Sequence, residues 1–177
     1  MPKVLDRMER QLLETARRQV ESLGYAKTTI RSVAAECGIA VGTVYNYFPS
    51  KEMLVATFVA EDWLSCTGPL SEQSFADSKA RIQAVYDAVR SFCESHRTLF
   101  SDSEAKSAYH AAVSGRHGML RAQLAELILP ACGDGDDNTF LSEFIAEALL
   151  TWTTEGKPFE ELYPVIEKLT GNEREES

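Results

Sequence analysis

The segment 28–51, with the sequence TTIRSVAAECGIAVGTVYNYFPSK, constrains the fold of this chain more than any other. Its first half predicts a short helix over 29–37, because apolar residues recur there at helical spacing, at Ile30, Val33, Ala34 and Cys37. Thr29 can cap this helix, since its hydroxyl can accept a free backbone N–H. Gly38 follows the last periodic residue, where a left-handed backbone conformation would end the helix.

The second half of the segment predicts another short helix, over 41–48. Val44 and Phe48 lie four residues apart and would face the first helix, and Ser50 would cap the helix that follows. Two short helices joined by a tight turn form a helix-turn-helix, in which the second helix is presented to the major groove of DNA. The outward-facing residues at and around this helix are therefore candidates for DNA contact: Ala40, Val41, Gly42, Thr43, Tyr45, Asn46 and Tyr47.

These residue types suit a surface that enters a groove. Gly42 has no side chain to hold the helix away from the bases. Tyr45 can pack its ring against a thymine methyl group or bond to a phosphate, and Asn46 can bond to base edges or to phosphate. Thr43 and Tyr47 offer hydroxyls to phosphate. The alternative is that the two tyrosines pack a small domain, but flanking an asparagine on a short helix they would then expose apolar surface for no reason.

The distribution of charge supports DNA binding at one end of the chain only. The whole chain has 18 Lys and Arg against 27 Asp and Glu, and a net charge of −9. Residues 1–51 nevertheless carry 8 basic and 5 acidic side chains, including Lys51, which could offer its charge to a phosphate. The remainder carries 10 basic and 22 acidic side chains. A basic N-terminal module on an acidic body is the asymmetry expected when one end meets DNA.

An ordered string of residues runs through both predicted helices: Thr28-Thr29-Ile30, Val33-Ala34, Cys37-Gly38-Ile39, the run from Gly42 to Phe48, and Ser50-Lys51. This string resembles the TetR/AcrR family of bacterial transcriptional regulators over about the first third of the chain. The resemblance implies that Thr29 and Lys51 contact phosphates. It also implies that Arg31 and Val41 read bases, with Arg31 the best candidate for a guanine contact. Ala40 departs from the family, whose members often carry serine there.

The rest of the chain is predicted to be helical, because no segment alternates apolar and polar residues as a strand would. Further helices are expected over 6–23, 51–65, 77–97, 103–113, 119–129, 138–154 and 159–169, with a break at Ser114–Gly118. The predicted fold is all-α, with a three-helix helix-turn-helix DNA-binding domain at the N-terminus and a helical ligand-binding and dimerisation domain after it. The expected boundaries are 1–51 and 52–170, followed by a disordered tail, 171–177.

The last two predicted helices carry more apolar surface than one buried stripe needs. The residues in question are Phe144, Ala148, Leu149, Trp152, Leu162, Val165, Ile166 and Leu169. We expect two such helices from each subunit to form a four-helix bundle, giving a homodimer that matches a palindromic operator. The alternative is that these helices only cover the core of their own subunit.

The body between these two regions is the expected site of a small-molecule inducer. Its helices combine large aromatic and polar residues with an irregular break at Gly115 and Gly118, a setting in which pockets form. The expected lining residues suggest an apolar or aromatic compound: Tyr86, Phe92, His96, Tyr109, His110 and Met119. By resemblance, the protein is a repressor that leaves its operator when this compound binds. The alternatives are that these residues are plain core, and that the body serves only for dimerisation.

Other classes of protein are disfavoured by the sequence. No phosphate loop, nucleophile elbow or metal-binding motif is present, so we expect neither an enzyme nor a cofactor or metal. The four cysteines lie far apart and are expected to be buried thiols, with redox sensing as the alternative. No apolar run is long enough to span a membrane, and a cytoplasmic protein is expected. A helix-turn-helix used only for protein contacts stays open, and would show no salt-dependent affinity for duplex DNA.

Overall fold

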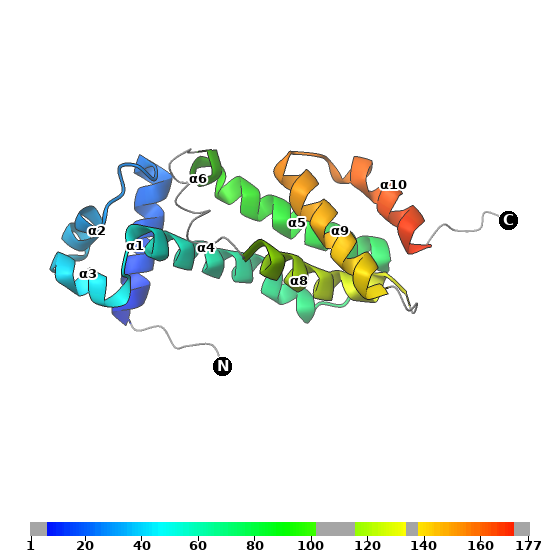
Figure 1. The fold of residues 1–177 in the computed structure, drawn as a ribbon, viewed down its shortest axis with the longest axis horizontal. Helices are drawn as coiled ribbons and strands as arrows, with labels where there is room; N and C mark the ends of the chain where they lie inside the picture. The colour runs from blue at the N-terminus through cyan, green and yellow to red at the C-terminus, as the bar shows by residue number, and fades with distance from the viewer. Residues whose placement is uncertain (1–6, 102–115, 134–137, 172–177) are drawn as a thin grey trace. The chain divides into compact units, whose positions relative to one another are not determined.

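The computed structural model describes residues 7–101, 116–133 and 138–171. In these ranges the chain forms α-helices joined by turns and two 3-10 helices, and contains no strand (Figure 1). This confirms the prediction of an all-α fold. The helices are α1 (Arg7–Leu23), α2 (Ile30–Cys37), α3 (Val41–Tyr47), α4 (Lys51–Thr67), η1 (Gly68–Ser71), α5 (Ser78–Ser95), α6 (Arg97–Ser101), α8 (Arg116–Ile128), η2 (Leu129–Ala131), α9 (Asn138–Thr154) and α10 (Phe159–Thr170).

The chain divides into two compact units. The N-terminal unit comprises Met1–Trp63 and Ser95–Ser114, and the C-terminal unit comprises Leu64–Glu94 and Gly115–Ser177. Helix α4 contributes to both units, because its last residues fall in the second. The functional boundary expected between residues 51 and 52 stays a prediction.

The N-terminal unit is held together by apolar residues that recur at helical spacing on one side of each helix. Helix α1 packs against α2 and α6, and α2 packs against α3. The side chains that fill the core include Leu12, Leu13, Val33, Val44, Leu54 and Phe58, all fully or almost fully buried. Each such side chain contributes roughly 1.5–3 kcal/mol by leaving water. This core fixes the positions of the two short helices, which are too short to be stable alone.

The helix ends in this unit agree with the sequence predictions. Thr29 caps α2, because its Oγ1 accepts a hydrogen bond from the Ser32 N–H. The Ser32 Oγ in turn accepts a hydrogen bond from the Thr29 backbone N–H, which completes a capping box. Gly38 ends the helix with φ of 69°, a left-handed conformation that favours glycine. Ser50 caps α4 by accepting from the Met53 N–H at 3.2 Å. Short-range chemistry therefore determines where these helices begin and end.

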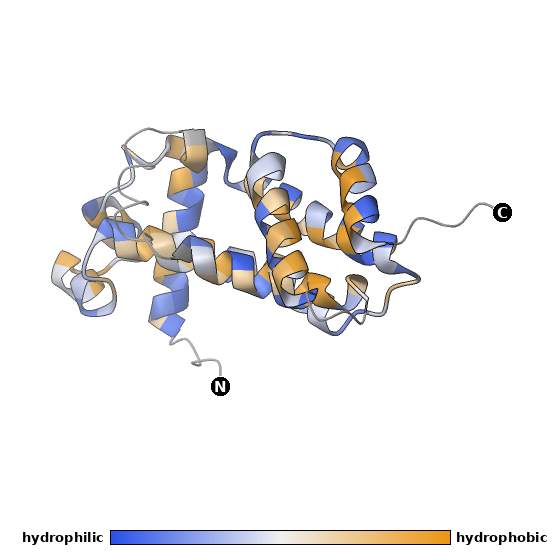
Figure 2. Cartoon of the chain, turned by 45° about the vertical axis from the view of Figure 1, so that its right-hand side comes forward, coloured by the Kyte–Doolittle hydropathy of each residue, from blue (hydrophilic) through white to orange (hydrophobic). Residues whose placement is uncertain are grey.

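The C-terminal unit is built around the pair α8 and α9, with α10 packed against α9. Its buried residues include Ile82, Val85, Val89, Leu124, Ile128, Ile145 and Leu149. The rings of Tyr86, Phe159 and Tyr163 form a cluster, with Phe159 5.4 Å from Tyr86 and 5.2 Å from Tyr163 between ring centres. Figure 2 shows hydrophobic and hydrophilic residues on different sides of the same helices, as amphipathic packing requires.

Two sequence predictions need correction. The predicted break at 114–118 is wrong at Gly118, which lies inside α8, because one helical glycine costs only about 1 kcal/mol relative to alanine and good helix formers follow it. The helix predicted over 77–97 ends at Ser95, and His96 forms a turn before the short helix α6. Gly115 and the helix predicted over 103–113 lie outside the described residues.

Candidate nucleic-acid interface

Helix α3 divides its residues between a buried side and an exposed side. Val44 is fully buried and Phe48, the residue after the helix, is almost fully buried, as predicted. Tyr45 keeps 52% of its surface exposed, an unusual exposure for a large ring, and Gly42 and Asn46 are exposed beside it. The helix thus presents an aromatic ring and an amide on a face that no described residue covers.

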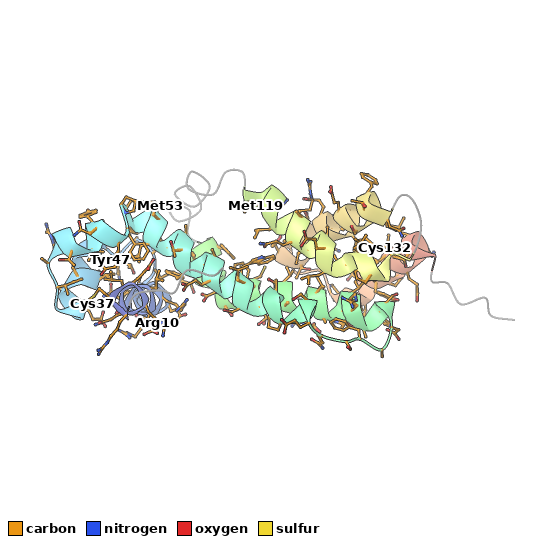
Figure 3. All side chains as sticks on the ribbon, turned by 90° about the horizontal axis from the view of Figure 1, so that it is seen from below. Arg10, Cys37, Tyr47, Met53, Met119 and Cys132 are labelled. Carbon is orange, nitrogen blue, oxygen red and sulfur yellow. The ribbon has the colours of Figure 1, made fainter. Side chains whose placement is uncertain are left out.

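The remaining predicted contact residues of this helix lie at the border of that face. Val41, Thr43 and Tyr47 are each half-buried, and Ala40 is exposed at the helix start. Figure 3 labels Tyr47 on α3. Ala40 caps α3 in an extended conformation and makes no side-chain hydrogen bond, as its methyl group requires. These half-buried side chains therefore pack partly against the protein and remain partly exposed at the border of the exposed face.

An open space surrounds the backbone of Gly42. A Cβ atom built at this position would meet no atom of the protein within 4 Å. Packing therefore does not require glycine here, and neither does backbone conformation, because its φ is not positive. An added methyl group would point only outward, into open space.

Helix α2 places two further predicted contacts at its start. Thr29 accepts the Ser32 N–H with its Oγ1 at 3.0 Å, so its own hydroxyl proton remains available to an acceptor such as a phosphate oxygen. Arg31, in the first turn of the helix, is exposed. These two residues therefore supply a hydroxyl donor and a guanidinium from the same turn.

A polar network ties α2 to α1 beneath this surface. The buried Gln19 donates to Glu36 and accepts a 2.7 Å bond from the Ser32 hydroxyl, and Arg18 also donates to Glu36. These hydrogen bonds, first that of Gln19 and then that of Arg18, lower the pKa of the Glu36 carboxyl. No local pattern predicts this network, because its members are separated by 13 to 18 residues.

Lys51, predicted to contact phosphate, makes contacts within the protein. Its ammonium donates to the Tyr25 carbonyl at 2.7 Å and lies 3.6 Å from the centre of the Tyr25 ring. Its side chain is half-buried. The contact of Lys51 with DNA stays a prediction. Its contact with Tyr25 is a structural role that the sequence did not predict, because the two residues are far apart along the chain.

The six residues predicted to line a ligand pocket fall into four groups. Tyr86 and Phe92 are buried in the C-terminal unit, where the Tyr86 hydroxyl donates to the Lys157 carbonyl at 3.0 Å. Met119, labelled in Figure 3, is 60% exposed on α8. His96 belongs to the N-terminal unit. Tyr109 and His110 lie outside the described residues, and the ligand-binding role of all six residues stays a prediction.

One buried polar group in the C-terminal unit was not anticipated. Thr153, on α9, is only 6% exposed, and its hydroxyl oxygen has no hydrogen-bond partner among the described residues. A buried hydroxyl without a partner costs about 1–3 kcal/mol. Such a group is a candidate for contact with a ligand or with water.

Neither metal chemistry nor a membrane span is evident in the described ranges. They contain no group of three or more His, Cys, Asp or Glu side chains arranged to hold a metal ion. None of the helices within them is long and apolar enough to cross a membrane. Helices α1, α2 and α3, with one side of α3 exposed, form a helix-turn-helix, the arrangement by which many proteins bind DNA.

Comparison with known proteins agrees with this helix-turn-helix. The family model described as bacterial regulatory proteins, tetR family, matches residues 12–57. An uncharacterised HTH-type transcriptional regulator of Bacillus subtilis, YuxN, is 39% identical over 51 residues, which is 29% of this chain. This chain spans only 18% of the length of YuxN.

Solved structures share the fold over almost the whole chain. GusR of Salmonella enterica aligns with a TM-score of 0.60 and 15% identity, covering 96% of this chain and 97% of GusR. FadR of Bacillus subtilis, solved in complex with stearoyl-CoA, aligns with a TM-score of 0.50 and 20% identity, covering 92% of this chain and 95% of FadR. The segment 12–57, which contains the helix-turn-helix, therefore matches the tetR family of bacterial regulatory proteins.

Proposed function

We propose that this protein is a homodimeric transcriptional repressor that binds a palindromic operator and releases it when a small apolar or aromatic molecule binds the C-terminal unit. It would act in the cytoplasm, where bacterial DNA lies. The observation that carries the proposal is the exposed face of α3, with Tyr45 and Asn46 presented on a helix whose other side is buried. Repression itself rests on the family.

The proposed interface combines readout and anchoring. Arg31 and Tyr45 would contact base edges, because both are exposed and end in groups that suit the major groove. The Thr29 hydroxyl, Thr43 and Tyr47 would bond to phosphates and fix the register of the helix. Gly42 would let the backbone approach the bases. One such module reads only a few base pairs, so two copies are required for a specific site.

The proposed dimer interface lies on the last two helices. Phe140, Phe144 and Trp152 are exposed on α9, and Val165 and Leu169 are exposed on α10. Leu149 and Ile166, which were included in the predicted interface, are buried within the subunit. Five large apolar side chains exposed on two adjacent helices exceed the isolated exposure that a monomer surface normally shows. A second copy of the same two helices would cover them as a four-helix bundle.

The ligand site is proposed within the C-terminal unit. Thr153 supplies an unpaired hydroxyl next to an apolar core, the combination of one polar anchor and apolar walls that small-molecule sites use. FadR shares this fold and was solved with a long-chain acyl thioester, stearoyl-CoA, which supports an apolar ligand here. The ligand must prefer the state that binds DNA poorly, since equal affinity for both states would shift nothing.

Selection from random duplex DNA tests the proposed function. We expect a palindromic site, bound with an affinity that falls steeply as salt rises, because counterions are released from the phosphates. Tyr45→Ala should weaken binding to this site, and Arg31→Ala should relax preference at one base position at a cost of roughly 1–3 kcal/mol. Arg90→Ala is the matched control, because Arg90 is exposed and paired with Glu94 in the C-terminal unit.

Two results would contradict the proposal. The absence of any salt-dependent affinity for duplex DNA would favour a helix-turn-helix used for protein contacts. Wild-type affinity and specificity in both the Tyr45 and the Arg31 variants would remove α2 and α3 from the interface.

A further inference from the structure

A polar cluster in the N-terminal unit joins three segments that are far apart in sequence. Asp62 on α4 accepts two hydrogen bonds from Arg17 on α1, at 2.7 Å from Nη2 to Oδ1 and at 3.1 Å from Nε to Oδ2. The Nε2 atom of His96 lies 3.1 Å from the same Oδ2. His96 occupies the turn between α5 and α6. One carboxylate therefore connects helix α1, helix α4 and this turn.

The surroundings of the cluster hold its members in place. His96 is 7% exposed, and its ring centre lies 5.8 Å from that of Phe100. The Arg17 guanidinium lies 5.4 Å from the centre of the Phe58 ring, and its planar fork matches the two carboxylate oxygens. A pair held this way in a half-buried site is worth more than an exposed ion pair, because water screens it less. The cluster therefore contributes to the attachment of α1 to α4.

We propose that His96 is a positioning residue for DNA binding, whose protonation strengthens the attachment of α1 to α4 through Asp62 and thereby raises affinity for the operator. This inference rests on the proposed function and adds to it a regulatory input, pH, at a residue outside the helix-turn-helix. Helix α1 packs directly on α2. Stronger attachment of α1 to α4 would therefore also hold the helices that contact DNA more rigidly.

The charges of the cluster give the direction of the effect. Arg17 is positive, while Asp62 and Glu61, which lies 3.8 Å from Arg17, are negative, so the set carries an excess negative charge when His96 is neutral. Protonation of His96 cancels that excess and converts its bond to Asp62 into a charge-assisted one. Histidine is the side chain that changes charge between about pH 5 and 8.

Glu61, next to Asp62 on α4, is a second carboxyl group beside Arg17. Burial raises the pKa of Glu61, and Arg17 acts against that rise, while Glu9 and Arg10 of α1 oppose each other at the same site. Arg97 is the first residue of α6, and Glu94 on α5 pairs with Arg90. Burial raises the pKa of the Cys93 thiol on α5 to about 11, so this thiol stays neutral.

The histidine content of the chain makes the test selective. The chain has three histidines, His96, His110 and His117, and none lies in the helix-turn-helix. A pH dependence of histidine type in DNA binding must therefore come from outside the DNA-contacting helices. His117 provides a matched control, because it also bonds to a carboxylate, Glu147, at 2.9 Å, but in the C-terminal unit and at an exposed position.

The experiment measures operator affinity of the full-length protein by fluorescence anisotropy at about pH 5.5, 6.5 and 7.5 and constant ionic strength. We expect the wild type to bind about fivefold more tightly at the lowest pH than at the highest, a typical coupling between sites. His96→Gln should show a flat profile, while His110→Gln and His117→Gln should keep the wild-type profile. Asp62→Asn, which removes the shared charge with little change of shape, should also flatten it.

Several results separate the possible failures. A flat wild-type profile, or a His96→Gln profile like that of the wild type, would overturn the inference while leaving DNA binding intact. The absence of DNA binding at every pH would instead overturn the proposed function, and the inference with it. Circular dichroism checks that each variant is folded. Should His96→Gln be unfolded, an unaltered profile in Asp62→Asn would overturn the inference.

Discussion

The ammonium group of Lys51 lies 2.7 Å from the carbonyl oxygen of Tyr25 and 3.6 Å from the centre of its ring. Lys51 is the first residue of α4, and Tyr25 follows the end of α1. This contact therefore links the two ends of the segment that contains α2 and α3. The Tyr25 hydroxyl donates to Glu52 at 3.2 Å from the same helix start. A residue predicted to bind phosphate thus also stabilises the module that would bind DNA.

Replacement of Lys51 by alanine should therefore have two effects. The free energy of unfolding should fall by about 1 kcal/mol, the combined worth of a cation–π contact and a hydrogen bond at a half-exposed site. Operator affinity should fall for all sequences alike, and the slope of its logarithm against that of salt concentration should decrease by about 1 if Lys51 also reaches a phosphate. Urea denaturation and anisotropy titrations measure the two effects.

Lys79→Ala is the control for this prediction. Lys79 lies over the ring of Tyr163 at 5.0 Å in the C-terminal unit, so its loss removes a similar contact away from α3. It should leave the salt slope unchanged. A Lys51 variant with lower stability and an unchanged salt slope would assign Lys51 a structural role alone.

A glycine-to-alanine pair separates helix stability from DNA contact. Gly42 in α3 and Gly118 in α8 are both helical, and a Cβ at either meets nothing within 4 Å. Alanine at either should stabilise the protein by up to about 1 kcal/mol, because alanine loses less backbone entropy than glycine. Only Gly42→Ala should weaken operator binding, since its methyl group would lie between α3 and the bases. Equal operator affinity in both variants would show that α3 does not approach DNA at Gly42.

The dimer is tested by placing charges on the exposed apolar face. Phe144 is 52% exposed on α9 and Val165 is 59% exposed on α10. The double variant Phe144→Glu, Val165→Glu should sediment as a monomer at micromolar concentration, because two carboxylates per subunit would be buried without partners. It should also lose most operator affinity, since one module reads only a half-site.

The control replaces an exposed leucine outside this face. Leu23→Glu, at the end of α1, should leave the sedimentation behaviour of the wild type unchanged. A wild-type protein that is itself monomeric at micromolar concentration, or a double variant that still dimerises, would contradict the assignment of the interface.

Thr153→Val tests the buried hydroxyl of the C-terminal unit. Valine has nearly the same shape and no polar atom, so removal of an unpaired buried hydroxyl should raise the free energy of unfolding by about 1 kcal/mol. Thermal denaturation measures this effect. A thermal-shift screen of small apolar compounds should then give hits whose stabilisation is smaller in Thr153→Val than in wild type. A less stable variant would mean that the hydroxyl is hydrogen-bonded in solution, and unchanged hits would place the ligand elsewhere.

The helix-turn-helix was predictable because its determinants are local. The apolar spacing of Val33, Val44 and Phe48, the hydroxyl of Thr29 and the flexibility of Gly38 each act within a few residues, and each behaves in the structure as predicted. The break at Gly118 was mispredicted by the same reasoning, because one weak residue does not outweigh the helix formers around it. Local sequence thus determined which segments are helices and which faces they bury.

Tertiary structure decided which polar groups meet. Lys51 contacts Tyr25 across 26 residues, Arg17 reaches Asp62 across 45, and His96 reaches the same carboxylate across 34. No periodicity relates these positions, because their contacts depend on how helices pack and not on spacing along one helix. The bond between His96 and the Asp62 carboxylate was therefore not predictable, and the expected ligand contact of His96 stays a prediction. The sequence alone determined the helices and their amphipathic faces, and only their packing determined the partners of its charged side chains.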